Sequence, residues 1–454
     1  MRLDLTENRL STSATDLKPA VEAHDLLNKV GQTATIEGAV LNIREMKWGG
    51  FIVLRTPTST IQVVVSTDQL SQFKKGDFVT VKGEVKSKKS KTGIPEIEIS
   101  CGEVKILSSS QIEPSFDVAG LNLTASQSNV LDERLLSLRN PTERAIFQVK
   151  AEIARAFREF LVGQRFTEIF SPKIVGGNAE GGANVFSLDY FGTPAFLAQS
   201  PQFYKQFMVP VHGRVFEVGP VFRAEASRTT RHLTTYTSMD LEMGPIDGFQ
   251  DVMQMEATML AHVIASVRKN CAEAFDLLKK GEVLQEDLPD MAAGIPQVRF
   301  ADAKRMIEDR FGKQSNDDHD LEPEDERLIS QAVHEETGSD FVFVTHYPWE
   351  KRPFYAKRDP DDRGVTKSFD LLFRGVEITT GGQRINDYDE QVQAIRDKGL
   401  DPSGFEQFLR LHQLGTPPHG GLGLGLERLT MKLTGLENIK RATLFPRDLT
   451  RLNP

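Results

Sequence analysis

Four cationic side chains gather in one polar stretch that lies between two apolar runs. They are Arg223, Arg228, Arg231 and His232, and Glu225 follows the first of them by two residues. A guanidinium group matches phosphate oxygens with paired hydrogen bonds and keeps its charge, so a polyphosphate is the natural ligand of such a loop. In an extended segment Arg223 and Glu225 share a face, where the carboxylate could accept a hydrogen bond from an amino group of the same ligand.

The apolar runs on both sides of this loop are predicted to be strands. Residues 215–222 form a short apolar run, and in residues 236–243 Met239, Leu241 and Met243 alternate with polar side chains. Two strands would hold the charged groups of the loop rigidly. On residue types alone, a solvated, charged hairpin is the alternative interpretation.

A second charged stretch, SFDLLFRGVEITTGGQRIND, contains Asp370, Glu377, Thr380 and Arg384. A strand that carries two carboxylates, followed by two glycines and an arginine, could hold Mg²⁺ through a carboxylate while the ion also binds substrate phosphates. Taken singly, these residues would be interpreted as solvated charges.

The stretch FLAQSPQFYKQ places Gln199, Ser200, Gln202 and Lys205 close together. With an acid such as Glu180 nearby, these residue types suit a substrate that carries an ammonium group, an α-carboxylate and a side-chain carboxylate. The glycines beside Glu180 suit a mobile lid, and a surface turn is the alternative.

Near the end of the chain Gly421, Gly423 and Gly425 alternate with leucines. Their spacing does not match GxGxxG, and no GxxxxGK[ST] occurs, so Rossmann and P-loop sites are excluded. Alternating glycines on a strand let a flat ring lie close to the backbone. Arg428 is predicted to begin a helix that ends near Gly435, with its guanidinium facing that ring or a γ-phosphate.

Residues 33–107 contain five short strand-like runs and no long helix, which predicts a small barrel of the OB type. Such barrels bind single strands by stacking bases on aromatic rings and reading base edges with amides. Phe51 and Gln62 are the candidates, although Phe51 taken alone is better explained as a core aromatic. The same region has twelve Lys and Arg against nine Asp and Glu over residues 24–110. Its clustered lysines could follow a phosphate backbone; they are Lys82, Lys86, Lys88, Lys89 and Lys91.

A polar, serine-rich segment follows the barrel and has the composition of a hinge. After it, Asn140 as a cap, Pro141 at the first position and Glu143 three residues after the cap predict the start of a long helix. Gly163 lies where that helix should stop.

The composition is that of an ordinary globular protein, with 39% hydrophobic residues and a formal net charge of −9, which argues weakly against a protein that coats nucleic acid. Cys101 and Cys271 form no CxxC pair, so neither a disulfide framework nor a structural zinc site is indicated and a reducing cytoplasm is expected. No segment has the length of a membrane span or the apolar core of a signal peptide.

Three motifs together resemble a known family. FRAE, TTRHL and DLEM resemble motif 2 of the class II aminoacyl-tRNA synthetases in the form of the aspartate and asparagine enzymes. The helix from Asn140 with FTEIFSPKI, including Pro172, is similar to motif 1, which forms the dimer interface in this family. GLGLGLER with LFPRD is similar to motif 3 in its aspartate-type form.

With the OB pattern before them, these motifs cover nearly the whole chain and resemble the archaeal and eukaryotic-like aspartyl-tRNA synthetases (subclass b). The implied fold is α+β, with a five-stranded OB barrel and a catalytic antiparallel sheet flanked by helices. The implied divisions are an extension 1–23, an anticodon-binding domain 24–108, a hinge 109–138 and a catalytic domain 139–454.

The resemblance implies an aspartate–tRNA ligase that uses ATP and Mg²⁺, binds L-aspartate and tRNA(Asp), and forms a cytoplasmic homodimer. It implies catalytic roles for Arg223 and Arg428. It implies ATP contacts at Arg223, Ala224, Glu225, Arg231, His232, Leu233, Glu377, Gly425, Leu426, Glu427 and Arg428. It implies aspartate contacts at Glu180, Gln202, Phe203, Tyr204, Lys205, Arg223, Thr380 and Arg384. It implies metal contacts at Asp370, Glu377 and Thr380, and anticodon contacts at Phe51 and Gln62.

Lys205 favours aspartate over asparagine, because a pocket with two cations would leave a buried charge unpaired beside a neutral amide. Three alternatives stay open. The enzyme could also charge tRNA(Asn), a choice that lies in details such as residues 41–48. A tRNA-independent amide synthetase and a non-catalytic RNA-binding paralogue are the others. The stretch LRTPTSTIQ departs from the family pattern, in which LR is commonly followed by an Asp and a Gly-containing turn, so the anticodon contact could differ in geometry.

Overall fold

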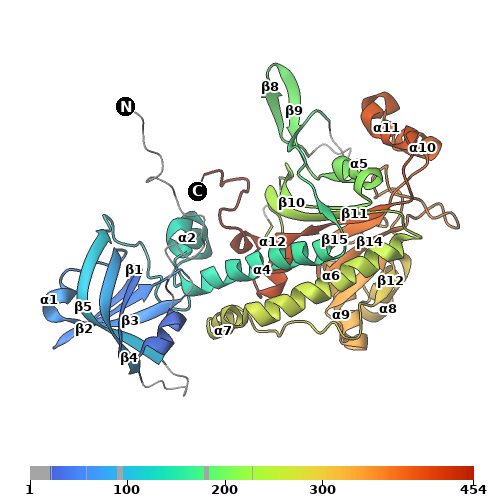
Figure 1. The fold of residues 1–454 in the computed structure, drawn as a ribbon. Helices are drawn as coiled ribbons and strands as arrows, with labels where there is room; N and C mark the ends of the chain where they lie inside the picture. The colour runs from blue at the N-terminus through green and yellow to red at the C-terminus, as the bar shows by residue number, and fades with distance from the viewer. Residues whose placement is uncertain are drawn as a thin grey trace, which may run out of the picture. The chain divides into compact units, whose positions relative to one another are not determined.

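The computed structural model describes residues 21, 23–57, 59–88, 96–177, 184–226 and 229–453. The chain forms two compact units, residues 1–125 and 126–454, shown as ribbons in Figure 1. Four charged residues singled out from the sequence lie outside the described residues, as do the two glycines beside Glu180 and almost all of the predicted extension 1–23. The four residues are Lys89, Lys91, Glu180 and Arg228.

The first unit contains a closed barrel of five strands with the order β1-β2-β3-β5-β4. The strands are β1 (Thr33–Met46), β2 (Gly49–Arg55), β3 (Thr60–Ser66), β4 (Phe78–Lys88) and β5 (Glu96–Ser108), with the short helices η2 (Ala23–Lys29) and α1 (Thr67–Leu70). Alternate side chains point inward, and Ile52, Leu54 and Val63 are fully buried. The predicted five-stranded OB barrel is confirmed.

The second unit is built on an eight-stranded sheet with the order β12-β13-β14-β15-β16-β11-β10-β6. Its strands are β12 (Gln297–Arg299), β13 (Phe341–Thr345), β14 (Ser368–Phe373), β15 (Val376–Gln383), β16 (Gly420–Gly425), β11 (Thr235–Met243), β10 (Arg214–Phe222) and β6 (Thr167–Glu168). All pairs are antiparallel except the two outermost. The sequence prediction of an antiparallel sheet is therefore confirmed, and both strands flanking the cationic loop belong to it.

Two long helices, α4 (Pro141–Gly163) and α6 (Phe249–Asn270), run side by side along one face of the sheet (Figure 1). The cap of α4 is the predicted one, since the Asn140 side chain accepts hydrogen bonds from the backbone N–H groups of Thr142 and Glu143. The other helices are α2 (Gln127–Asp132), α3 (Arg134–Ser137), α5 (Gln202–His212), α7 (Ala272–Lys280), α8 (Phe300–Phe311), α9 (Pro323–Thr337), α10 (Tyr388–Asp397), α11 (Glu406–Gln413) and α12 (Leu426–Leu433), with the 3₁₀ turns η3 (Pro402–Phe405) and η4 (Ile439–Ala442). A small sheet, β7 (Ile174–Val175), β9 (Thr193–Leu197) and β8 (Ser187–Tyr190), completes the unit.

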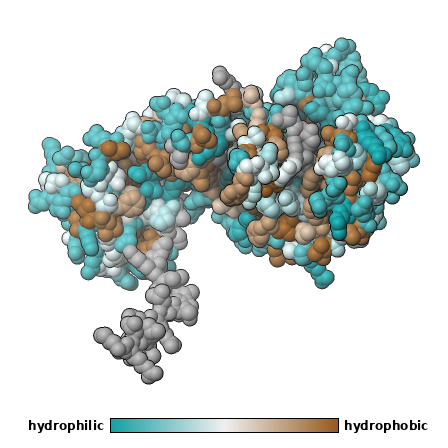
Figure 2. Space-filling view, turned by 90° about the horizontal axis from the view of Figure 1, so that it is seen from above, coloured by the Kyte–Doolittle hydropathy of each residue, from teal (hydrophilic) through white to brown (hydrophobic). Residues whose placement is uncertain are grey.

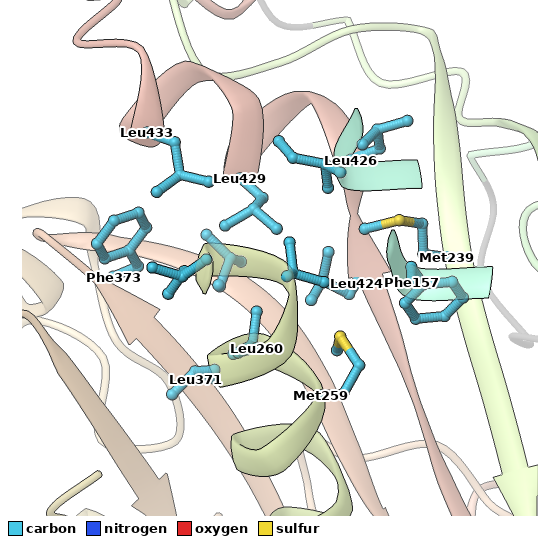
Figure 3. Close-up of a cluster of buried hydrophobic side chains, with 14 of the residues drawn as sticks. Phe157, Met239, Met259, Leu260, Leu371, Phe373, Leu424, Leu426, Leu429 and Leu433 are labelled. Atoms are coloured by element: carbon cyan, nitrogen blue, oxygen red, sulfur yellow. The ribbon is translucent and has the colours of Figure 1, made fainter. Parts of the chain in front are cut away.

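The main core lies between the sheet and these helices. In Figure 3, Met239 and Leu424 from the sheet point toward Met259 and Leu260 of α6, with Leu429 of α12 in the same cluster. Burying each such side chain contributes about 1.5–3 kcal/mol. This apolar face fixes the strands, so that the polar residues between them must point to the opposite face.

Two local predictions differ from the structure. The Glu143 carboxylate does not complete a capping box, because it pairs instead with the guanidinium groups of Arg134, at 3.0 Å, and Arg441. The motif 3 helix begins at Leu426, two residues before Arg428, because the strand β16 ends at Gly425 and the chain turns directly into the helix.

The surface shown in Figure 2 mixes hydrophilic and hydrophobic residues. Among the described residues, none of the helices has the length and apolar character that crossing a membrane requires.

Candidate active site

One cavity of 370 Å³ lies on the polar face of the large sheet and collects side chains from stretches far apart in the sequence. The cationic loop, β11, β14, β15, β16 and α5 all contribute to its wall. The residues predicted from the sequence that line it are Gln199, Ser200, Gln202, Lys205, Arg223, Glu225, Arg231, His232, Leu233, Asp370, Glu377, Thr380, Arg384, Gly423, Gly425, Glu427 and Arg428. Charged groups that the sequence separates by more than two hundred positions therefore meet in one place.

The strand register explains why these groups converge. Asp370 lies opposite Thr380, Thr380 opposite Gly423, and Gly423 opposite Asp240. Residues that are paired across strands point to the same face of a sheet. One row of the sheet thus presents two carboxylates and a hydroxyl to the cavity, and Glu242, opposite Gly421, lies in the next row on the same face.

The alternating glycines of β16 make room for these acids. A Cβ atom built at Gly421 would lie 2.1 Å from Oε2 of Glu242, and one at Gly423 would lie 3.1 Å from Oδ1 of Asp240. At Gly421 any side chain would therefore collide with the carboxylate. The sequence suggested that these glycines admit a flat ring; at Gly421 the space is filled by the protein's own glutamate.

The two cations predicted to bind the substrate carboxylates are paired with these acids. Lys205 Nζ lies 2.9 Å from Asp240 Oδ1 and 3.6 Å from Glu242 Oε2, and Arg384 Nε donates to Glu242 Oε1 at 2.8 Å. Burial would raise the pKa of Glu242, but Arg384 and Lys205 outweigh it and hold that pKa below its ordinary value. The four side chains form a buried, charge-balanced cluster.

Several buried polar atoms at this end of the cavity have no hydrogen-bond partner among the described residues. They are Oε1 of Gln199, Nε2 of Gln202 and Oδ2 of Asp240. A buried polar atom left unpaired costs about 1–3 kcal/mol, so folded proteins rarely retain several together. A donor and two acceptors that converge on one cavity indicate a site for a polar ligand.

The cationic loop forms the opposite end of the cavity. Arg223 lies over the ring of Tyr236, with 5.6 Å from the guanidinium carbon to the ring centroid, and Nη1 of Arg223 is 3.8 Å from Glu225 Oε1. His232 lies 3.9 Å from the same carboxylate. Burial lowers the pKa of His232, so its imidazole is largely neutral at pH 7 and can act as a hydrogen-bond donor.

Arg428 ties motif 3 to β15. Its Nη1 donates to the backbone oxygen of Glu377 at 2.6 Å and lies 3.3 Å from Oε1 of the same residue. Thr380 Oγ1 donates to that carboxylate at 3.2 Å. Although burial acts in the other direction, Arg428 and the neighbouring guanidinium groups lower the pKa of Glu377 and keep it ionised.

Asp370 and Glu377 were predicted to hold a magnesium ion, and their chemistry fits one. Burial and the nearby Glu377 carboxylate raise the pKa of Asp370, its Oδ1 has no hydrogen-bond partner among the described residues, and its Oδ2 is 2.8 Å from Arg352. Within the described residues no group of three or more His, Cys, Asp or Glu side chains is arranged to hold a metal. Two carboxylates suit Mg²⁺, which commonly takes one or two carboxylates and completes its shell with substrate phosphates and water.

Sequence reasoning missed three acids that organise the site. Asp240 and Glu242 were identified only as the polar face of a strand, and their partners lie 35 and 142 residues away. Glu326 on α9 pairs with Arg231 and also accepts a hydrogen bond from the backbone N–H of Glu377 at 2.8 Å. Burial and the nearby Glu377 raise the pKa of Glu326 to about 7.

Four predicted contacts lie elsewhere. Phe203 and Tyr204 line a neighbouring cavity, the Leu426 side chain is buried in the main core, and Ala224 hydrogen bonds through its backbone N–H to Asn184. Glu427 lines the main cavity, but its carboxylate is bound by Lys150 at 2.7 Å and by a backbone N–H of β11. Glu427 therefore supports the site through these bonds, and any ligand contact from Leu426 would have to come from the backbone.

In the barrel unit, Phe51 and Gln62 lie on the outer face of neighbouring strands. They are diagonal neighbours, because Phe51 lies opposite Val64 and Gln62 lies opposite Val53 in the next row. All four side chains are half-buried. The Gln62 amide donates to Glu98 at 2.8 Å and accepts from Lys88 at 3.4 Å, so its orientation is fixed.

Comparison with known proteins agrees with this architecture. The family described as tRNA synthetases class II (D, K and N) matches residues 126–449, and the OB-fold nucleic acid binding domain family matches residues 34–107. The chain is 42% identical over 429 residues to an aspartate–tRNA(Asp/Asn) ligase of Deinococcus radiodurans, covering 93% of this chain and 96% of that protein. It is 37% identical to an aspartate–tRNA(Asp) ligase of Pyrococcus abyssi, covering 93% and 97%.

Among solved structures, the asparaginyl-tRNA synthetase of Pyrococcus horikoshii complexed with asparaginyl-adenylate is similar to the chain with a TM-score of 0.86 and 29% identity. The similarity covers 96% of this chain and 100% of that one. Both the sequence relatives and the structural relative extend over the barrel and the large sheet together. The chain belongs to the class II tRNA synthetases of the D, K and N group.

Proposed function

We propose that the chain is an aspartate–tRNA ligase that activates L-aspartate with ATP and transfers it to the 3′ end of tRNA. The convergence of Arg223, Glu377, Arg384 and Arg428 on one cavity carries this proposal. Such a cavity can hold a triphosphate and a small diacid at the same time. The relatives named as aspartate–tRNA ligases, which match nearly the full length of the chain, support the same activity.

In the first step a carboxylate oxygen of aspartate attacks the α-phosphorus of ATP, the bond to the β-phosphate oxygen breaks, and pyrophosphate leaves. We assign Arg223 to the α-phosphate, where it neutralises the charge that develops on the oxygens, and Glu225 to the adenine amino group. Arg231, His232 and Arg428 hold the departing pyrophosphate. The step needs no protein nucleophile, because positioning and charge stabilisation supply the rate enhancement.

The amino acid is assigned to the cluster around β11. Oδ2 of Asp240 can accept a hydrogen bond from the ammonium group of aspartate, the Gln202 amide can donate to a carboxylate, and Arg384 binds the side-chain carboxylate. Lys205 acts by holding Asp240 in place. Because Glu242 already balances one of the two cations, selection against asparagine depends on the polar atoms that an amide would leave unpaired.

Asp370 and Glu377, with the Thr380 hydroxyl beside them, would hold magnesium. When bound, the ion supplies positive charge to the phosphate oxygens. The chain's own contribution is to keep Glu377 ionised through Arg428 and to keep Asp370 close by through Arg352.

In the second step the terminal ribose hydroxyl of tRNA attacks the carbonyl carbon of the aspartyl adenylate and AMP leaves. We assign the outer face of the barrel, with Phe51 and Gln62, to the anticodon. A homodimer through the motif 1 region is part of the proposal, and the 83% exposed Phe170 in that region supports it. The cytoplasmic location stays a prediction from the sequence.

The test is aspartylation of two transcripts, tRNA(Asp) and tRNA(Asn), each with aspartate and with asparagine. Transfer of aspartate to tRNA(Asp) is expected, and transfer of asparagine is not. Charging of neither transcript, with either amino acid, would contradict the proposal.

A second candidate is an enzyme that also aspartylates tRNA(Asn). The relative from Deinococcus radiodurans, named for both tRNAs, favours it, whereas the one from Pyrococcus abyssi is named for tRNA(Asp) alone. The ratio of kcat/KM for the two transcripts in the same assay decides between them.

A further inference from the structure

An exposed tryptophan lies beside the proposed anticodon-binding residues of the barrel. Lys47 and Trp48 form the two-residue turn between β1 and β2, and 53% of Trp48 is exposed. Its ring contacts Phe51 edge-on, with 5.2 Å between the ring centroids and 88° between the ring planes. Exposing a large aromatic ring to water is unfavourable. When exposed rings cluster beside a proposed binding face, a role in binding is the natural explanation.

The strand register shows what surrounds these rings. Arg44 lies directly opposite Phe51, and Asn42 lies directly opposite Val53 in the next row. Side chains paired in this way share the outer face of the barrel. Arg44 is exposed, so two aromatic rings, a guanidinium and an amide lie together on one surface.

We propose that Trp48 is a second base-stacking residue of this surface and binds a nucleotide of the anticodon loop adjacent to the one bound at Phe51. The inference rests on the proposed tRNA ligase function and on the match of residues 34–107 to a nucleic acid binding domain. Arg44 and Lys47 supply the positive charge that a phosphate backbone requires. Aromatic rings stack on any base, so this contact adds affinity without selecting one base.

The angle between the rings restricts the form of the RNA. Two bases that stack on perpendicular rings cannot stack on each other, so the surface accepts neighbouring nucleotides only when they are splayed apart. A continuous double helix does not offer bases in that arrangement, whereas a single-stranded loop does. The surface is therefore suited to the anticodon loop and not to a helical stem.

Intrinsic fluorescence offers a direct test, because the chain has two tryptophans. The other one, Trp349, is 6% exposed, and its ring centroid lies 4.1 Å from the guanidinium carbon of Arg358 and 4.4 Å from Nζ of Lys398. Titration of the full-length protein with a tRNA(Asp) transcript is expected to quench the Trp48 emission. A minihelix transcript that has the acceptor stem but no anticodon arm is expected to leave it unchanged.

Kinetics of the variants complete the test. Trp48→Leu is expected to raise KM for tRNA(Asp) roughly 5- to 150-fold, the loss of one stacked base, while Trp48→Phe restores most of the affinity. Pyrophosphate exchange, which needs no tRNA, should be unchanged in both. Phe78→Leu, which removes a 44% exposed aromatic from β4 of the same barrel, serves as the matched control and should leave KM unchanged.

An unchanged KM for Trp48→Leu together with an absent quench would overturn the role of Trp48. Normal charging by the wild-type protein in that case would leave the ligase function intact, so the two proposals fail separately. A change in self-association of Trp48→Leu, with no effect on tRNA, would also overturn the proposal and assign the residue to a protein contact.

Discussion

Buried carboxyl groups on the two faces of the catalytic sheet have pKa values that are shifted in opposite directions. The two faces are nevertheless formed by neighbouring residues of the same strands. On the cavity face, Glu242 is fully buried, and its pKa is held below the ordinary value by Arg384 and Lys205. On the helix face, Glu256 of α6 is equally buried, and burial raises its pKa to about 8. The difference between the two carboxyl groups lies in their partners and not in their depth.

This contrast shows that the two faces of the sheet have different roles. The helix face stabilises the strands through apolar contacts, and a carboxyl group there stays protonated at neutral pH. On the cavity face, nearby cations lower the pKa of Glu242 and Glu377, and Gly421 on the adjacent strand leaves the space that Glu242 needs. Ionised groups that are held in fixed positions are what a site for phosphates and a diacid requires.

The largest expected effect comes from the end of the cavity face that would bind phosphate. Arg223→Ala should abolish aspartate-dependent exchange of pyrophosphate into ATP, since loss of one charge-stabilising donor typically costs on the order of 10² to 10³ in rate. Substantial residual exchange would contradict the assigned role. Arg327→Ala, which removes an exposed arginine that pairs with Glu324 on the surface of α9, is the control.

Removal of a partner inside the paired cluster should be nearly as severe. Glu242→Gln leaves Lys205 and Arg384 without their common carboxylate and should lower the free energy of unfolding by about 3–5 kcal/mol, measured by urea denaturation. Because the pKa of Glu242 is lowered in the folded state, the stabilisation that it provides is present above its ordinary pKa and is lost as the pH falls through the folded value. A variant as stable as the wild type would show that the cluster is not held by charge pairing.

Lys205 tests the same cluster through substrate binding. Lys205→Ala should weaken activation of aspartate by roughly 2–5 kcal/mol, seen in kcat/KM for aspartate, because Asp240 loses its cation. Lys279→Ala, from an exposed pair with Asp287, should leave the kinetics unchanged. Equal kinetics for the wild type and Lys205→Ala would remove Lys205 from the site.

The effect expected on the helix face is smaller for each pH unit than the losses predicted above. The folded chain holds the Glu256 proton up to a pKa of about 8, whereas the unfolded chain releases it near 4.5. In that window the folded state binds more protons, so stability falls as pH rises, by at most about 1.4 kcal/mol per pH unit. Glu256→Gln should remove this dependence in urea denaturation between pH 5 and pH 8, and an unaltered pH profile would contradict a raised pKa.

The sequence predicted the architecture and most of the cavity lining, because the motifs around Arg223, Glu377 and Arg428 are local in sequence and the strand periodicity is clear. It did not predict the pairing of Lys205 and Arg384 with Asp240 and Glu242. That pairing depends on which strands become neighbours, and periodicity does not specify strand order.

Long-range partners explain the other differences. Glu143 has the spacing of a capping residue, yet Arg134 and Arg441 compete for its carboxylate, and the second of these is 298 residues away. Glu326 belongs to an acidic segment with no recognisable motif, and only the fold brings it to Arg231. The glycines of β16 were explained through a ligand, whereas Gly421 is required by a neighbouring glutamate of the protein itself.

The most direct test of the account is pyrophosphate exchange by the wild-type protein with ATP and either aspartate or asparagine, in the absence of tRNA. Exchange that depends on aspartate and is not supported by asparagine is the predicted result. Exchange supported by asparagine alone, or no exchange with either amino acid, would contradict the claim that the paired charges on the cavity face bind ATP together with a small diacid.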